Sequence, residues 1–136
     1  MEQTPFNNTI LYIDDDVDDL QLLQEALASV NANCQIVEAH DGVEGLDRLH
    51  QMRDEGGLPC LIVLDINMPR LDGRKTFQLI RANEQLAHIP VVIFSTSNSE
   101  LDKMFFKGKD VEYITKPIRF SNLVSIATRL LEYCHT

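Results

Sequence analysis

Polar side chains that could do chemistry follow directly after short apolar runs in this sequence. Three aspartates, Asp14 to Asp16, come after the apolar residues 10–13, and a single aspartate, Asp65, comes after residues 61–64. Two later apolar runs end in hydroxyl and amine side chains, namely Ser95 and Thr96, and Thr115 and Lys116. Carboxylates bind hard divalent cations, and amines and hydroxyls bind phosphoryl oxygens. If the fold brings these groups together, they can hold a metal ion and a phosphoryl group.

The apolar runs have the length and composition of buried β-strands. They lie at residues 10–13, 34–37, 61–64, 91–94 and 111–114, and most of their side chains are β-branched or aromatic. Between them, apolar residues recur at spacings of three and four, which predicts amphipathic helices. The expected helical faces are Val17/Leu20/Leu23/Leu27/Val30, Val43/Leu46/Leu49, Phe77/Ile80, Leu101/Met104/Phe105 and Leu123/Ala127/Leu130/Leu131.

Strands that are apolar along their whole length are typical of a parallel sheet with helices on both faces. Five such strands alternating with helices predict an α/β fold, a doubly wound five-stranded parallel sheet with the flavodoxin-like strand order 2-1-3-4-5. In that order the carboxyl ends of the first and third strands are neighbours at the switch point, where ligands bind. We expect a single domain over residues 1–136, with a core from about residue 8 to about residue 133 and no output domain.

At the switch point, Asp14, Asp15 and Asp65 would repel one another by roughly 3 kcal/mol per pair at about 5 Å and an effective dielectric constant of about 20. Lys116 offers one compensating charge, and Mg²⁺ or Mn²⁺ is the natural second. A metal ion, an amine and the Ser95 hydroxyl around one carboxylate form a site for a phosphoryl group. We therefore predict that Asp65 is a nucleophile that forms an acyl phosphate.

Charge and cysteine content argue against several other classes of protein. The chain carries 12 Lys and Arg against 21 Asp and Glu, a formal net charge of −9, which disfavours binding to nucleic acid or to an anionic membrane. With no signal segment and no apolar run near the roughly 20 residues of a membrane span, we expect a cytoplasmic protein. We expect reduced, mostly buried thiols at Cys34, Cys60 and Cys134, because Cys34 and Cys60 lie on strands too far apart for a disulfide.

Four segments of the chain carry motifs that resemble a known family. They are residues 10–16 (ILYIDDD), 61–69 (LIVLDINMP) followed by LDG at 71–73, 90–95 (PVVIFS) and 113–117 (YITKP). Together they resemble the receiver domain of two-component response regulators, and in particular the stand-alone, chemotaxis-type (CheY-like) receivers. The long loops expected at residues 51–59 and 97–100 are similar to those of receivers that serve phytochrome-type kinases.

The resemblance implies a phosphorelay function. Asp65 would accept a phosphoryl group from a phosphohistidine of a sensor histidine kinase or phosphotransfer protein. Asp15, Asp65 and the main-chain carbonyl of Asn67 would ligate Mg²⁺, with Asp14 acting through a water molecule. Lys116 would bind the phosphoryl oxygens. No separate enzyme activity is expected beyond self-phosphorylation from a phosphodonor and autodephosphorylation.

The resemblance also implies a conformational switch. Ser95 would move to the phosphoryl group and Tyr113 would change rotamer with it, which alters the surface made by the fourth helix, the fifth strand and the fifth helix. That surface would control a downstream protein or form a homodimer. The peptide bond before Pro117 would be cis, an isomer that proline tolerates.

Five positions add expectations of their own. Thr96 stands where the family often has Ala or Gly, and its bulk is expected to slow phosphorylation. In the family that the chain resembles, the positions of Asn67 and Ser97 tune the lifetime of the acyl phosphate. The adjacent Phe105 and Phe106 cannot both face inward on a helix, so one of them is a candidate anchor for a partner.

An EF-hand calcium loop fits part of the acidic run. Asp14, Asp16, Asp18 and Glu25 fall at loop positions 1, 3, 5 and 12, but Asp19 replaces the glycine of position 6 and a strand precedes the run. Asp16 is better explained as the N-cap of the following helix. A flavodoxin shares the fold, but its cofactor phosphate would meet this acidic run.

Two further alternatives stay open. A phosphatase of the haloacid dehalogenase type uses the same residue types, but its nucleophile ends the first strand, whereas the isolated Asp65 here ends the third. The second alternative is a receiver-like module that binds its partner without phosphorylation.

Overall fold

Five parallel strands form the centre of the molecule in the order β2-β1-β3-β4-β5. The computed structural model describes residues 8–31, 33–117 and 119–134. Within them the strands are β1 (Thr9–Ile13), β2 (Gln35–Ala39), β3 (Leu61–Leu64), β4 (Val91–Ser95) and β5 (Glu112–Thr115). The predicted sheet and its strand order are confirmed.

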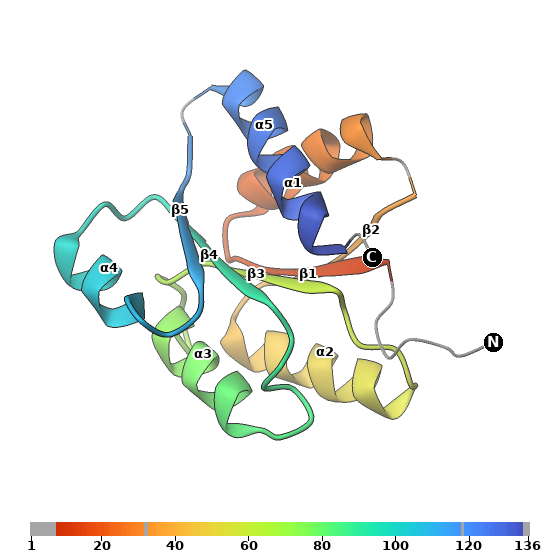
Figure 1. Ribbon diagram of the computed structural model, residues 1–136, viewed down its shortest axis with the longest axis vertical. Coiled ribbons are helices and arrows are strands. Elements are labelled where there is room, and N and C mark those ends of the chain that lie inside the picture. Colours follow the sequence, from red (N-terminus) through yellow and green to blue (C-terminus); the bar gives the residue numbers. More distant parts are fainter. Residues whose placement is uncertain (1–7, 32, 118, 135–136) are drawn as a thin grey trace.

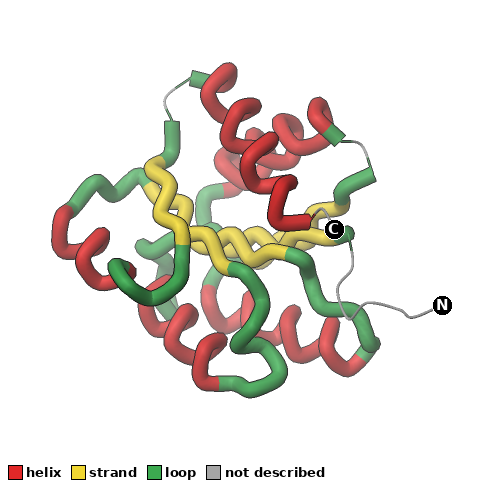
Figure 2. Tube along the Cα trace, in the orientation of Figure 1, coloured by secondary structure: helices red, strands yellow, loops and turns green. Residues whose placement is uncertain are grey.

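Helices cover both faces of this sheet. They are α1 (Val17–Val30), α2 (Gly42–Asp54), α3 (Gly73–Ala82), α4 (Glu100–Phe106) and α5 (Phe120–Leu131), followed by a short 3₁₀ turn, η1 (Glu132–Cys134). Helices α1 and α5 lie on one face, α2 and α3 on the other, and α4 lies beside the edge strand β5 (Figures 1 and 2). Because α2 continues to Asp54, the loop before β3 is shorter than the expected 51–59. None of the described helices is long and apolar enough to span a membrane.

The strand β1 shows why the sheet is buried on both sides. All five of its residues are buried, and successive side chains point to opposite faces. Leu11 and Ile13 join the apolar layer against α2 and α3, whereas Ile10 and Tyr12 join the layer against α1 and α5. The carboxyl end of β1 is therefore held from both sides.

Most of the predicted apolar helical faces are confirmed, but the predictions are wrong at the start of α1 and in α4. Val17, at the first position of α1, is 65% exposed. In α4, Leu101 and Met104 are 78% and 65% exposed, and the buried positions are Asp102 and Phe106. A seven-residue helix beside an edge strand has no full sheet face to cover, so its periodic apolar pattern does not identify the buried side.

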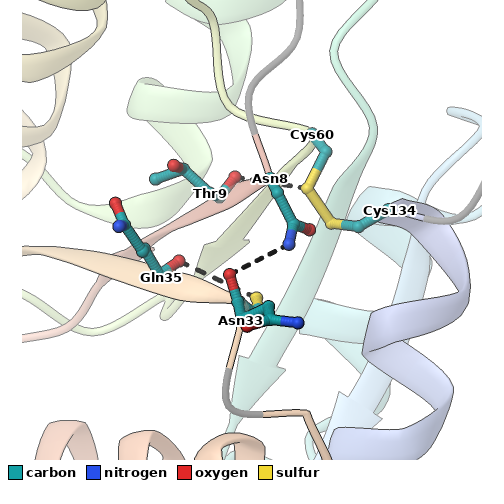
Figure 3. The surroundings of a disulfide bond; sticks show 7 residues. Asn8, Thr9, Asn33, Gln35, Cys60 and Cys134 are labelled. Carbon is teal, nitrogen blue, oxygen red and sulfur yellow. Dashed lines mark hydrogen bonds between the residues drawn. A yellow bond between two sulfur atoms is a disulfide. The ribbon is translucent and has the colours of Figure 1, made fainter.

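The expectation of three reduced thiols is wrong for two cysteines. Cys60 and Cys134 form a disulfide with a Cα–Cα distance of 5.2 Å (Figure 3). Cys34 keeps a free thiol. The sequence-based argument considered only strand neighbours. It missed that η1, after α5, returns to the start of β3 and brings Cys134 within disulfide range of Cys60.

Candidate functional site

The carboxyl ends of β1 and β3 bring three carboxylates together. The two strands pair with Ile13 opposite Leu64, and the Asp65 N–H donates to the Ile13 carbonyl at 3.0 Å. Asp14, Asp15 and Asp65 each offer an oxygen within 4.8 Å of the others. Asp14 and Asp65 are buried and Asp15 is exposed. The predicted cluster therefore forms, with its open side at Asp15.

Asp14 is the most tightly held member of the cluster. Its Oδ2 accepts hydrogen bonds from the Tyr12 hydroxyl at 2.8 Å and from Lys116 Nζ at 2.6 Å, and its Oδ1 accepts from the Asp16 N–H at 2.9 Å. Burial and the charge of Asp14 raise the pKa of the Tyr12 phenol, which therefore stays a donor. The sequence reasoning missed Tyr12. The sequence does indicate this residue, because side chains alternate between the two faces of a strand and Tyr12 and Asp14 therefore point to the same side.

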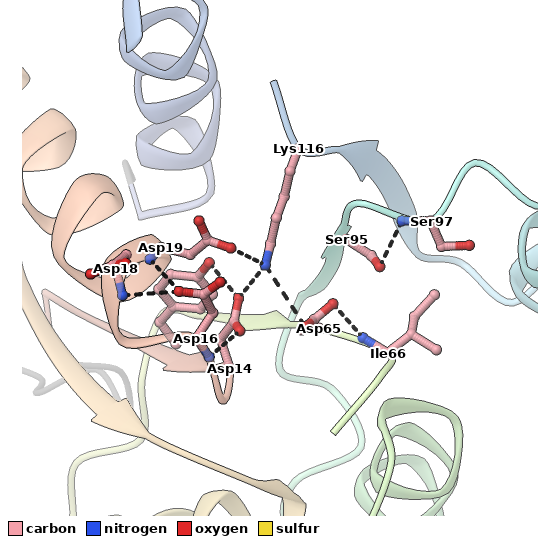
Figure 4. Close-up of polar contacts among 10 residues, drawn as sticks. Asp14, Asp16, Asp18, Asp19, Asp65, Ile66, Ser95, Ser97 and Lys116 are labelled. Carbon is pink, nitrogen blue, oxygen red and sulfur yellow. Dashed lines mark hydrogen bonds and ion pairs between the residues drawn. The ribbon is translucent and has the colours of Figure 1, made fainter. Parts of the chain in front are cut away.

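Asp16 turns away from the cluster and caps α1. Its Oδ1 accepts from the backbone N–H groups of Asp18 and Asp19 at 3.0 and 3.2 Å. The predicted N-cap is confirmed, and the EF-hand alternative is wrong because Asp18 and Asp19 lie in the first turn of a helix. The acidic run is thereby divided between a metal-type cluster and a helix cap (Figure 4).

Lys116 reaches into the cluster from the residue after β5. Its Nζ lies 2.6 Å from Asp14, 2.7 Å from Asp19 and 3.8 Å from Asp65, and its side chain is 8% exposed (Figure 4). Burial alone would lower the pKa of this amine, but the bonds to Asp14 and Asp19 raise it above its ordinary value. Sequence reasoning missed Asp19, which lies one helical turn from the cap Asp16 and so faces the same edge.

Asp65 is less well compensated than Asp14, the other buried carboxylate of the site. Its Oδ1 accepts the Ile66 N–H at 2.8 Å, and its Oδ2 faces Lys116. Burial, followed by the charge of Asp14, raises the pKa of Asp65 to about 6, against the lowering effects of Lys116, the Ile66 N–H and the Ser95 hydroxyl. A bound cation would relieve this unfavourable charge.

The expected switch residues meet at the β4–α4 segment. Ser95 is fully buried, and its Oγ accepts the Ser97 N–H at 3.2 Å. The Tyr113 hydroxyl donates to the Ser97 carbonyl at 2.9 Å. Thr96 and Asn67 are exposed around the site. Ser95 and Tyr113 are thus connected through one residue, Ser97, which sequence reasoning had noted only for its position.

The peptide bond before Pro117 differs from the expectation. The structure contains no cis peptide bond among the described residues, so the Lys116–Pro117 bond is trans. The trans form is the more stable isomer of an X–Pro bond by about 0.5–1 kcal/mol. The expectation of a cis bond at Pro117 was wrong.

The donor set suits a hard divalent cation. Carboxylate oxygens from Asp14, Asp15 and Asp65 converge without a histidine or cysteine ligand, which favours Mg²⁺ or Mn²⁺ over softer metals. The exposed side of the cluster leaves room for the water ligands that Mg²⁺ retains.

Fold and site together define a class of protein, a flavodoxin-like α/β domain whose switch point carries an acidic cluster paired with a lysine. Comparison with known proteins then identifies the family. Residues 10–128 match the response regulator receiver domain, and the chain belongs to this family. It is therefore neither a flavodoxin nor a member of the haloacid dehalogenase superfamily. Receiver domains are phosphorylated by histidine kinases and act on downstream targets.

Individual relatives are similar over most of their length. Response regulator Rcp1 of Synechocystis is 35% identical over 117 residues, which cover 84% of this chain and 80% of that protein. The phosphorylated cyanobacterial phytochrome response regulator RcpA superposes with a TM-score of 0.82 at 35% identity, covering 92% of this chain and 91% of the other. The Mn²⁺-bound form of Rcp1 superposes with a TM-score of 0.78 at 31% identity, covering 89% of both chains.

Proposed function

We propose that this protein is a phosphorylation-dependent signalling switch and that Asp65 accepts the phosphoryl group from a phosphohistidine. The donor is a sensor histidine kinase or a phosphotransfer protein. The observation that carries the proposal is the position of the Asp65 carboxylate. It lies at the switch point, 3.8 Å from Lys116 Nζ, and it shares the acidic cluster with Asp14 and Asp15.

The reaction requires the ionised carboxylate. An oxygen of Asp65 attacks phosphorus, the P–N bond breaks, its electron pair returns to the imidazole nitrogen, and an acyl phosphate remains. Lys116 is already charged and close, so it can bind the incoming phosphoryl oxygens with little reorganisation. Ser95 donates its hydroxyl to the same group once the β4–α4 segment moves.

The acidic cluster is proposed to hold Mg²⁺ or Mn²⁺. Asp15, Asp65 and the main-chain carbonyl of Asn67 are the ligands, and Asp14 acts through a water molecule. The cation supplies neutralisation of the charge on the phosphoryl oxygens. Because Asp15 and Asn67 are exposed, the cation and the donor can enter from the same side.

The output is proposed to leave through the surface of α4, β5 and α5. Leu101 and Met104 of α4 expose large apolar side chains there and suit contact with a downstream protein or a second copy of this chain. Tyr113 of β5 links this surface to Ser95 through Ser97. Thr96, exposed next to Ser95, is proposed to slow the approach of the donor.

The test is phosphorylation by a small donor. The protein is incubated with Mg²⁺ and acetyl phosphate or phosphoramidate, and its intact mass is followed. Wild type should gain one phosphoryl group, and Asp65→Asn should gain none. Asp18→Asn is the matched control, because it makes the same change at an exposed position of α1 and should be labelled like wild type.

Three results would contradict the proposal. Equal labelling of wild type and Asp65→Asn would exclude Asp65 as the acceptor. No labelling of a folded, Mg²⁺-binding wild type would favour the phosphorylation-independent binding module. Hydrolysis of small phosphate esters over many cycles would favour a phosphatase activity.

A further inference from the structure

The loop between β3 and α3, residues 66–72, is closed at its base. The Gly73 N–H donates to the Ile66 carbonyl at 2.7 Å, so the two ends of the loop lie against each other. The loop carries Asn67, whose main-chain carbonyl is a proposed ligand of the cation. Because both ends are fixed, the direction of that carbonyl depends on the backbone conformation of the few residues between them.

Arg70 bends this loop through an unfavourable backbone conformation. Its φ is 65°, in the left-handed region that residues other than Gly, Asn and Asp seldom adopt. The Leu71 N–H donates to the Pro69 carbonyl at 2.7 Å, which closes a three-residue γ-turn around Arg70. A γ-turn with a positive central φ is rare and strained, and it persists only where neighbouring groups hold it in place.

Asp41, the N-cap of α2, holds the side chain of Arg70. The guanidinium donates from Nε to Oδ2 at 2.8 Å and from Nη2 to Oδ1 at 3.0 Å. Asp41 is 8% exposed and also accepts the Glu44 N–H at 2.9 Å. Two bonds to a carboxylate that is itself fixed give this pair a defined geometry, which most surface ion pairs lack.

A main-chain contact joins the same two elements beside the pair. The Gly42 N–H donates to the Leu71 carbonyl at 3.3 Å. A Cβ added at Gly42 would lie 2.6 Å from that oxygen and 2.1 Å from Thr76 Oγ1, so the start of α2 is packed directly on the loop and on α3. The Arg70–Asp41 pair is thus the side-chain part of an attachment to a rigid element outside the loop.

We propose that the Arg70–Asp41 pair fixes the β3–α3 loop in the conformation that binds the cation, and so sets the affinity of the acidic cluster for Mg²⁺ or Mn²⁺. The inference rests on the proposed function, in which Asn67 supplies a ligand. Arg70 and Asp41 are positioning residues, because they act through the loop and do not contact the cation.

The test is a Mn²⁺ titration of the full chain, in which the EPR signal of the free ion gives the dissociation constant. Asp41→Asn removes the charge but keeps a good N-cap, and Arg70→Gly removes the guanidinium but keeps the left-handed turn accessible. Each variant should raise the dissociation constant by about 3- to 10-fold, at or below the lower end of the effect of residues that orient metal ligands. Urea unfolding checks that each variant is folded under the assay conditions.

The sign of the effect of Arg70→Gly separates positioning from simple electrostatics. Loss of a positive charge would by itself tighten cation binding, whereas loss of positioning weakens it. The double variant should bind no more weakly than the weaker single variant, because the pair acts as one unit. Asp54→Asn is the matched control. It breaks the Arg53–Asp54 pair at the other end of α2, removes the same charge as Asp41→Asn, and should leave the affinity unchanged.

The outcomes separate the positioning role from the function on which it rests. If both variants bind Mn²⁺ as tightly as wild type, or if Arg70→Gly binds it more tightly, the positioning role is wrong and the proposed function stands. If wild type binds no Mn²⁺, the metal site and the positioning role are both wrong. If the variants behave as predicted but phosphoramidate does not phosphorylate wild type, the proposed function alone is wrong. If Arg70→Gly does not fold, Arg70→Lys keeps the charge without the two-bond geometry and should also weaken binding.

Discussion

Asp65 is buried, yet its proposed role as a nucleophile requires an ionised carboxylate. Lys116 compensates Asp14 and Asp19 at 2.6 and 2.7 Å and lies farther, at 3.8 Å, from Asp65. The lysine is thus shared, and burial, followed by repulsion from Asp14, raises the pKa of Asp65. A bound cation would relieve this charge repulsion, which is already present in the free protein.

Burial and repulsion together predict that Asp65→Asn stabilises the metal-free protein. The pKa of Asp65 is raised from 3.8 to about 6 on folding, so the folded state binds the proton more tightly than the unfolded state. Wild type should therefore lose stability as the pH rises from about 4 to about 6, by about 1–3 kcal/mol, and Asp65→Asn should not. Urea unfolding in EDTA at pH 4 and pH 8 measures the difference. Equal stability of wild type and Asp65→Asn at pH 8 would contradict the prediction. Asp18→Asn is the control and should behave like wild type.

Asp15 is predicted to be required for metal binding. Mg²⁺ at 100 times its dissociation constant should stabilise wild type by about 2.7 kcal/mol, because it binds only the folded state. Asp15→Ala should remove most of this gain, whereas Asp18→Ala should keep it. Thermal unfolding with and without Mg²⁺ provides the measurement. An undiminished Mg²⁺ effect in Asp15→Ala would remove this residue from the site.

At the level of single residues, the site could be predicted where strand ends determine position. Asp14, Asp15, Asp65, Ser95 and Lys116 each follow an apolar run, and parallel strands deliver their ends to one edge. Three contributors could not be found in this way: Tyr12 lies within a strand, Asp19 within a helix, and the Arg70–Asp41 pair joins a loop to the cap of α2. Their contacts depend on how the helices pack, which periodicity does not specify.

At the level of elements, α3 is the helix that most directly shapes the acceptor. It begins at Gly73, where no side chain separates the helix from the backbone of Asp65 and Ile66. The preceding Asp72 caps the helix by accepting the Lys75 N–H at 3.0 Å. The loop that carries Asn67 is therefore short and fixed at both ends, by β3 and by this cap.

Gly73→Ala is predicted to be destabilising despite the higher helix propensity of alanine. Its Cβ would meet main-chain atoms of Asp65 and Ile66, so either the helix or the end of β3 must move. We expect a loss of about 1–3 kcal/mol in unfolding free energy and a slower phosphorylation. Gln78→Ala, at an exposed position of the same helix, should have little effect on either. Full stability and a normal rate in Gly73→Ala would show that the close packing has no role.

The elements themselves could be predicted from the sequence with few errors. The strands agree with the apolar runs to within two residues at each end, because burial on both faces requires continuous apolar residues. The helical pattern failed in α4, where Asp102 is buried and Leu101 is exposed. A buried charge is acceptable there because Arg74 and Ser97 pair with it, and such long-range partners leave no local pattern.

At the level of the whole molecule, the disulfide joins segments 74 residues apart. Cys60 precedes β3, so the bond lies at the amino-terminal edge of the sheet, and the acidic cluster lies at the opposite edge. Cys134 belongs to η1, directly after α5. The bond therefore fixes the end of α5 relative to the central strand without contacting the site.

Reduction of this disulfide is predicted to lower stability. In the chain-entropy model, closing a loop of this length raises the free energy of unfolding by about 4 kcal/mol. Losing that contribution corresponds to a fall in Tm on the order of 10 °C. Cys134→Ser should show the same fall without a reductant, and Cys34→Ser should unfold like wild type. Scanning calorimetry with and without a phosphine reductant tests this. An unchanged Tm on reduction would mean that the bond adds no stability.

The most direct measurement for the central claim is chemical trapping of the acyl phosphate. The protein is phosphorylated by phosphoramidate with Mg²⁺ and treated with borohydride, which reduces an aspartyl phosphate to homoserine, and peptide mass spectrometry locates the change. We predict homoserine at position 65 alone, with none in a sample that received no donor. Homoserine at position 14 or 15, or a phosphoryl group on a hydroxyl that resists borohydride, would contradict the assignment of Asp65 as the acceptor.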